Sequence, residues 1–171
     1  KYVAEHPDYH VYGYNTLPGH RDTEGLEESQ LASFQEALIE NHALSGFGSY
    51  DEFTTRCFAY AKLCQISAIG PAVSVEMFDH LRNAALDPKF QADVPLGSSY
   101  SSGDVIPAAH WAKGLLAYIR RIEPEFSLKP GEGMALINGS FIHLGYTVAA
   151  FERLLNIWAM MLDSIKSDIS L

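Results

Sequence analysis

The C-terminal segment, residues 141–169, constrains the fold most strongly. Apolar side chains recur there at alternating spacings of three and four residues, at Phe141, Leu144, Val148, Phe151, Leu155, Trp158, Leu162, Ile165 and Ile169. This spacing, sustained over about four heptads, is typical of a helix in a bundle or coiled coil. The 140 preceding residues offer no helix of matching length. We therefore expect the partner helices to come from other subunits or from a longer parent chain.

The rest of the chain predicts shorter helices joined by loops. We expect helices over residues 23–42, 49–69, 73–85 and 107–122, a short strand at 9–14, and long loops at 87–106 and 123–133. Ser49 and Glu52 fit a capping box, and the apolar stripe of the helix that follows is expected at Phe53, Cys57, Tyr60 and Cys64. The predicted fold class is all-α, with a loop-rich helical domain over 1–140 and the start of a central helical bundle over 141–171.

Charge and composition argue against some classes of binding partner. The 171 residues carry a net charge of −9 without a basic run, which argues against binding to nucleic acid or to an anionic membrane surface. No stretch is read as long enough to cross a membrane, and no signal peptide is recognised. Cys57 and Cys64 are expected to be reduced core thiols of a cytoplasmic protein. Because the chain starts at Lys1, we expect residues upstream.

The loop before the fourth expected helix carries the most chemical information. It reads Gly-Ser-Ser-Tyr-Ser-Ser-Gly-Asp from Gly97 to Asp104. A plain flexible loop is one interpretation of this composition. The other is a backbone condensation, in which the nitrogen of Gly103 attacks the carbonyl carbon of Ser101. Loss of one water from the ring and a second from the Ser102 hydroxyl would leave an exocyclic methylidene, with Asp104 assisting the proton transfers.

Four motifs carry a resemblance to a known family. They are Tyr12-Gly13-Tyr14-Asn15-Thr16; Asn41-His42-Ala43 with Gly46 and Gly48; Gly97-Ser98 through Ser101-Ser102-Gly103-Asp104, then Pro107 and His110; and Leu136-Ile137-Asn138-Gly139-Ser140. In this order and spacing the chain resembles the N-terminal part of the aromatic amino acid ammonia-lyases and aminomutases. These are the histidine, phenylalanine and tyrosine enzymes of the methylidene-imidazolone type.

The resemblance implies a role for each site residue. Tyr12 would be the base that removes a β-proton of the substrate, and Asn138 would hydrogen-bond near the ring or the amino-acid end of the substrate. Ser101, Ser102 and Gly103 would condense, aided by Asp104, into a 4-methylidene-imidazol-5-one that forms autocatalytically. Asn41 and His42 would contact the substrate. No metal is implied.

His42 indicates the substrate, because histidine lyases have a histidine at this position whereas phenylalanine and tyrosine lyases usually have leucine. The implied function is elimination of ammonia from an aromatic L-amino acid, with histidine favoured. The resemblance implies a homotetramer with active sites shared between subunits. The alternative is one piece of a nicked or separately expressed enzyme, in which a companion polypeptide completes the bundle.

Three departures and two alternatives accompany the resemblance. Ser101 replaces the usual alanine of the ring-forming triplet, and Leu17-Pro18-Gly19-His20 replaces the usual Gly-Phe-Gly. The carboxylate-binding arginine of the family falls beyond Leu171. An aminomutase would use the same ring. A non-catalytic paralogue or fragment, acting as a helical assembly module, would need no ring at all.

Overall fold

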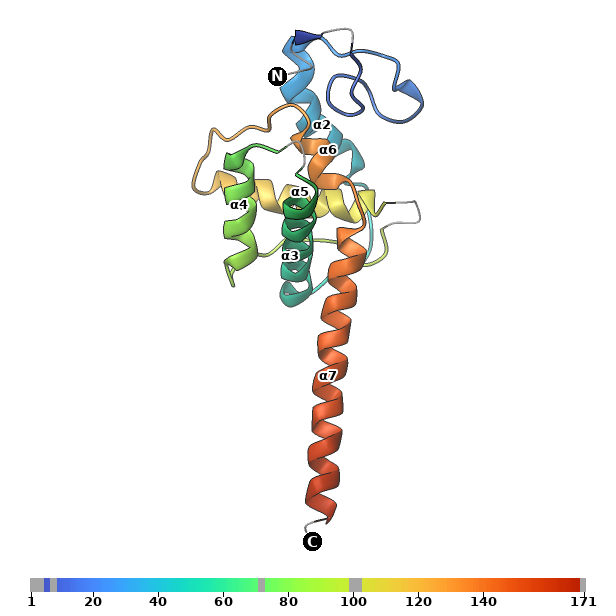
Figure 1. Cartoon of the computed structure of the whole chain (residues 1–171), viewed down its shortest axis with the longest axis vertical. Coiled ribbons are helices and arrows are strands. Elements are labelled where there is room, and N and C mark those ends of the chain that lie inside the picture. The colour runs from blue at the N-terminus through green and yellow to red at the C-terminus, as the bar shows by residue number, and fades with distance from the viewer. Residues whose placement is uncertain (1–4, 7–8, 71–72, 99–102, 170–171) are drawn as a thin grey trace.

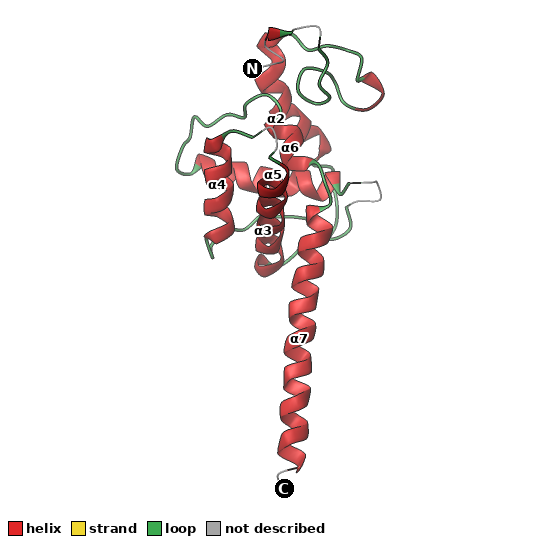
Figure 2. Ribbon diagram, in the orientation of Figure 1, coloured by secondary structure: helices red, strands yellow, loops and turns green. Residues whose placement is uncertain are grey.

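The computed structural model describes residues 5–6, 9–70, 73–98 and 103–169. Within these ranges the chain is helical and contains no β-strand, only isolated bridges that pair Thr16 with Tyr12 and with Gly25 (Figure 2). The α-helices are α2 (Leu31–His42), α3 (Glu52–Ile69), α4 (Val75–Leu86), α5 (Val105–Arg120), α6 (Glu132–Ile137) and α7 (Phe141–Ile169). Two short 3-10 turns, η1 (Gly19–Arg21) and η2 (Glu28–Gln30), precede them. The all-α prediction is confirmed.

The helices pack into one body from which α7 projects. Helix α3 packs against α4 and α7, while α2 packs against α5 and α6 (Figure 1). Trp111 joins these groups, since its ring meets the rings of Phe141 and Phe90 edge-on at centroid distances of 5.0 and 6.4 Å. Edge-to-face pairs of this kind add to the free energy of apolar burial. The start of α7 is therefore part of the core.

The N-terminal segment folds differently from the prediction. The expected strand at 9–14 is absent from the described residues, and the first long helix begins at Leu31 rather than Thr23. Main-chain bonds explain the late start: Leu17 N–H donates to the Glu24 carbonyl oxygen at 3.0 Å and Leu26 N–H donates to that of Asn15 at 2.8 Å. These bonds tie residues 23–27 to the preceding loop. The main chain there is therefore not available to form the first turns of the expected helix.

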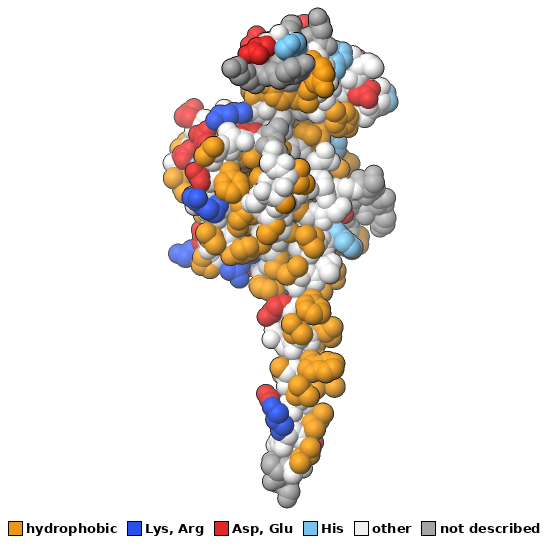
Figure 3. Space-filling view, in the orientation of Figure 1, with side chains coloured by type: hydrophobic (Ala, Val, Ile, Leu, Met, Phe, Trp, Pro, Cys, Tyr) orange, Lys and Arg blue, Asp and Glu red, His pale blue; other side chains and the backbone are white. Residues whose placement is uncertain are grey.

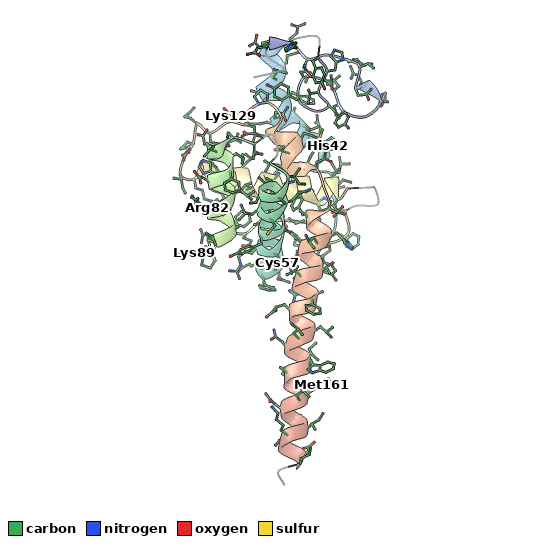
Figure 4. The ribbon with its side chains drawn as sticks, in the orientation of Figure 1. His42, Cys57, Arg82, Lys89, Lys129 and Met161 are labelled. Atoms are coloured by element: carbon green, nitrogen blue, oxygen red, sulfur yellow. The ribbon has the colours of Figure 1, made fainter. Side chains whose placement is uncertain are left out.

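Helix α3 corrects two further predictions. Its N-cap is Asp51, which accepts the Thr54 N–H at 2.9 Å, whereas Ser49 donates to Asp93 instead of closing a capping box. The buried face contains Phe58, Ala59, Ala61, Lys62 and Ile66. The predicted stripe lies on the other side of the helix, so Cys57 is half-buried and Cys64 is exposed (Figure 4). The interpretation of both thiols as core residues was wrong.

Helices α4 and α5 follow the prediction closely. Met77, Leu81 and Ala84 are buried on α4, whose N-cap Ser74 accepts the Met77 N–H at 3.1 Å. On α5 the expected stripe is buried at Ala108, Trp111 and Leu115 but exposed at Ile122, which lies beyond the end of the helix.

The long terminal helix is confirmed, and most of it is exposed. Only Phe141, Ile142, Gly145 and Ala149 are buried on α7, and every described residue from Ala150 onward is exposed, including Trp158 at 64%. Apolar side chains gather along one side of this projecting part in the view of Figure 3. A continuous apolar surface of this extent marks an interaction site.

The same helical region corrects the sequence analysis on membrane-spanning length. Glu132–Ile169 is long and apolar enough to cross a membrane, with a mean hydropathy of 1.3 over its best window. Glu152 and Arg153 are the sole charged side chains between Phe141 and Met161. Length and composition alone are weak evidence, because a core helix of a soluble bundle meets the same criteria.

Candidate active site

The loop from Gly97 to Asp104, called the ring-forming loop below, ends in a left-handed turn that is anchored to α7. Ser101 and Ser102 lie outside the described residues, but Gly103 has φ +94° and Asp104 has φ 49°. Asp104 accepts the His143 N–H through Oδ2 at 3.0 Å, and its main-chain oxygen accepts the Ala108 N–H at 2.9 Å. One residue thus ties the loop to the first turns of both α5 and α7. A glycine is needed before it, since other residues rarely adopt so positive a φ.

The other end of the loop is held by the segment that follows α2. Tyr50 N–H donates to the Val94 carbonyl oxygen at 2.9 Å, and the Phe47 carbonyl oxygen accepts from the Leu96 and Gly97 N–H groups at 3.2 and 3.3 Å. Residues 47–50 therefore run beside 94–97. Both flanks of the loop are fixed by hydrogen bonds.

These contacts bring the segment that follows α2 to the ring-forming loop. Ser98 is buried and donates to the Pro95 carbonyl oxygen at 3.1 Å. His110 Nε2 lies 2.6 Å from the Leu44 carbonyl oxygen, which holds the first turns of α5 against the segment after His42. His110 thus holds α5 against the segment that follows α2.

His42 is the last residue of α2 and is half-buried (Figure 4). Its Nδ1 lies 2.7 Å from the Leu38 carbonyl oxygen. Because a carbonyl oxygen can only accept, Nδ1 carries the proton in this contact, and the other ring nitrogen, Nε2, is the acceptor of the neutral imidazole. The neighbouring Asn41 is exposed. His42 is therefore oriented by its own helix and can accept a hydrogen bond from a ligand.

Tyr12 lies in the N-terminal loop segment, with 51% of its surface exposed. Its Oη accepts the Gly19 N–H at 3.0 Å. Leu17-Pro18-Gly19-His20, the segment that departs from the family pattern, thus supplies the donor that holds the Tyr12 hydroxyl oxygen. The sequence analysis did not predict this contact.

Gln35 is a buried residue that the sequence analysis missed. Its Nε2 donates to the Gly13 carbonyl oxygen at 3.1 Å, and its Oε1 accepts the Met134 N–H at 3.3 Å. One side-chain amide therefore joins the loop that contains Tyr12 and Gly13 to α2 and α6. A signal was present, since Gln35 lies in phase with the apolar Leu31 and Leu38, and a buried amide needs partners.

Asn138 forms the C-cap of α6, where its N–H donates to the Met134 carbonyl oxygen at 3.0 Å. Its own main-chain oxygen accepts from Lys62 Nζ at 2.9 Å. A cavity of about 380 Å³ adjoins this turn and is lined by Lys62, Gln65, Ile66, Ile69, Ala135, Asn138 and Gly139. The sequence analysis did not identify Lys62, although it lies in phase with the buried Phe58 and Ile66 on α3.

The structure assembles part of the predicted site. The segment that follows α2, residues 44–50, lies beside the flank of the ring-forming loop at residues 94–98. Gly13, next to Tyr12, is linked to α6 through the side chain of Gln35. Among the described residues, no hydrogen bond links Tyr12 to Gly103, Asp104 or Asn138. Within the described part of the chain, Tyr12 is therefore not hydrogen-bonded to the other predicted catalytic residues.

A group with metal-ligand chemistry lies elsewhere. Potential ligand atoms of Glu76, His80 and Glu123 fall within 4.8 Å of one another. Glu76 is also paired with Lys129 at 2.6 Å, so one of the carboxylates is already neutralised. None of these residues belongs to the predicted catalytic set.

Comparison with known proteins places this geometry in a family. Residues 1–165 match the family model described as aromatic amino acid lyase. The chain belongs to this family. Histidine ammonia-lyase from Deinococcus radiodurans is 32% identical in an alignment of length 150 that covers 78% of this chain and 28% of that protein. A probable histidine ammonia-lyase from Thermoplasma acidophilum is 31% identical over 147 residues, 76% of this chain and 29% of that protein.

Solved structures of other proteins share the fold of this aromatic amino acid lyase chain. Ergothionase from Treponema denticola superposes with a TM-score of 0.75 at 18% identity, over 91% of this chain and 34% of that one. Tyrosine aminomutase from Streptomyces globisporus gives a TM-score of 0.69 at 23% identity, over 84% of this chain and 30% of that one. The chain spans about three tenths of the length of the curated relatives it matches.

Proposed function

We propose that the protein containing this chain eliminates ammonia from an aromatic L-amino acid, with histidine favoured. The observation that carries the proposal is the loop with Ser101, Ser102 and Gly103, whose described flanks are held by hydrogen bonds. Membership of the aromatic amino acid lyase family supports it, as do the two relatives named as histidine ammonia-lyases.

The described residues fit a methylidene-imidazolone at this loop. Gly103, the residue whose nitrogen would close the ring, combines a positive φ with the absence of a Cβ, so its nitrogen can approach a neighbouring carbonyl carbon. Asp104 holds the turn in place through His143. Once formed, the group would supply an electrophile that makes the substrate amine a better leaving group.

The chain's own side chains supply the remaining functions in this proposal. Tyr12 Oη removes the β-proton of the substrate, which is too weakly acidic to leave without a positioned base. Asn138 hydrogen-bonds near the ring or the amino-acid end of the substrate. His42 offers Nε2 to the N–H of a substrate imidazole, a contact that a phenyl ring cannot make.

The assembly we propose is a homotetramer with active sites shared between copies. Two observations support it: the apolar, exposed part of α7, and the lack of a described contact between Tyr12 and the ring-forming loop. Partner helices would cover α7, and Tyr12 of one copy would serve the loop of another. A companion polypeptide that supplies the missing helices is the alternative.

The intact mass of the purified protein tests the proposal. We expect a deficit of two water molecules against the sequence mass, located by peptide mapping to residues 101–103, and release of ammonia from L-histidine. Conversion to a β-amino acid would instead identify an aminomutase. The full sequence mass together with absent ammonia release would refute the proposal and leave the assembly-module alternative.

Substrate choice is tested by His42→Leu. We expect the ratio of kcat/KM for L-histidine to that for L-phenylalanine to fall roughly tenfold, because one hydrogen bond to the substrate ring is lost. His80→Leu is the matched control, since His80 is also half-buried but lies on α4 against Phe126. An unchanged ratio in His42→Leu would remove His42 as a specificity residue.

A further inference from the structure

A lysine is buried in the core beside the candidate active site. Lys62 is 1% exposed and is among the largest fully buried side chains of the described chain. It lies on the buried face of α3, one turn after Phe58 and one turn before Ile66. Lysine is almost never fully buried unless it is paired. The position therefore calls for a specific reason.

The Lys62 ammonium group contacts neutral partners. Its Nζ donates to Gln65 Oε1 at 3.0 Å and to the Asn138 main-chain oxygen at 2.9 Å, and it lies 4.5 Å from the centroid of the Phe141 ring. Within the described residues, no carboxylate forms an ion pair with it. Burial lowers the pKa of Lys62 to about 7. A charge buried without a counter-ion costs free energy, which an apolar side chain of similar length would avoid.

Lys62 and Gln65 both contact the turn between α6 and α7. Lys62 holds the carbonyl oxygen of Asn138, which is the oxygen of the peptide that joins Asn138 to Gly139. Gly139 has φ +93°, and a Cβ built on it would lie 2.0 Å from Gln65 Nε2. Gln65 therefore packs directly on the glycine while it accepts from Lys62. The turn between α6 and α7 is fixed by both α3 side chains.

We propose that Lys62 is a positioning residue, which together with Gln65 fixes the Asn138–Gly139 turn so that Asn138 is presented to the reacting molecule. The inference rests on the proposed function for the role of Asn138. The geometry of the turn itself does not depend on it. Lys62 acts through the main chain of Asn138 and needs no contact with substrate.

Lys62→Met in the full-length protein tests this role, because methionine keeps an unbranched side chain and removes the donors. We expect the two-water mass deficit to persist, kcat to fall roughly tenfold, and KM to change much less. Backbone amides of residues 138–142 should exchange with deuterium roughly tenfold faster. Lys89→Met is the control, because it removes an exposed lysine next to α4 (Figure 4). It should leave kcat and the exchange rate of residues 138–142 unchanged.

A second variant keeps the test decisive if Lys62→Met does not fold. Gln65→Met is nearly isosteric and removes the amide that accepts from Lys62 and packs on Gly139. We expect the same faster exchange at 138–142 and a lower kcat. Unchanged exchange and kcat in a folded variant of either residue would overturn the proposal. If the wild-type protein has its full sequence mass and no activity, the proposed function fails, and deuterium exchange alone still decides whether Lys62 holds the turn.

Discussion

Ser102→Ala is expected to abolish ammonia release and to remove the deficit of two water molecules from the measured mass. Without the Ser102 hydroxyl, the second water cannot leave and no methylidene can form at residues 101–103. Loss of the electrophile should lower kcat by at least about 10³-fold, the scale seen when a covalent catalyst is removed. The measurement pairs intact mass with ammonia release from L-histidine.

The neighbouring serine provides the control for this experiment. Ser101→Ala restores the residue that the family usually has at the first position of the triplet, so the two-water deficit and the activity should both be kept. The described flanks at Ser98 and Asp104 are unaffected by either change, since each is held by its own hydrogen bond. Ammonia release by Ser102→Ala at the wild-type rate would disprove the ring as the source of catalysis.

The sequence predicts the parts of this structure that depend on local pattern. The terminal helix, the inner face of α4 and the Gly70 end of α3 all follow from spacings of three and four residues or from a glycine with positive φ. In each of these cases the residues that form the pattern lie close together along the chain, within one helix or one turn.

Long-range polar contacts are what the pattern could not show. Gln35 meets Gly13 and Met134, and Lys62 meets Asn138, across sequence separations of 22, 99 and 76 residues. A polar residue on an apolar stripe is interpreted as a surface position until its partner is known. The stripe of α3 was misassigned for this reason, because its true buried face contains Lys62.

The start of the first helix shows the same limitation. Residues 23–27 contain glutamates that favour a helix N-terminus, yet Glu24 accepts a main-chain bond from Leu17 and pairs with Arg21. Pairing with a preceding loop is not visible in helical periodicity. The ion pair, between two exposed side chains, contributes little free energy by itself.

Tyr12→Phe is expected to keep the two-water deficit and lose turnover. Removal of the base should lower kcat by about 10²–10⁴-fold, the usual contribution of a positioned acid or base. The substitution removes the acceptor of the Gly19 N–H, but the loop stays anchored because Gln35 still donates to the Gly13 main-chain oxygen. Tyr14→Phe, two residues along the same loop and half-buried, is the matched control and should retain activity.

The same variant tests whether sites are shared between copies. Within the described chain no hydrogen bond joins Tyr12 to Asp104 or Asn138, so we expect its hydroxyl to serve a ring in another copy. Co-expressing Tyr12→Phe chains with Ser102→Ala chains should then restore ammonia release, because some sites receive an intact tyrosine from one copy and an intact loop from the other. Activity should appear only in mixed oligomers, separable by differently tagged chains. If mixed oligomers form and stay inactive, both groups must come from one chain, and Tyr12 would have to reach the ring by a movement of the N-terminal loop.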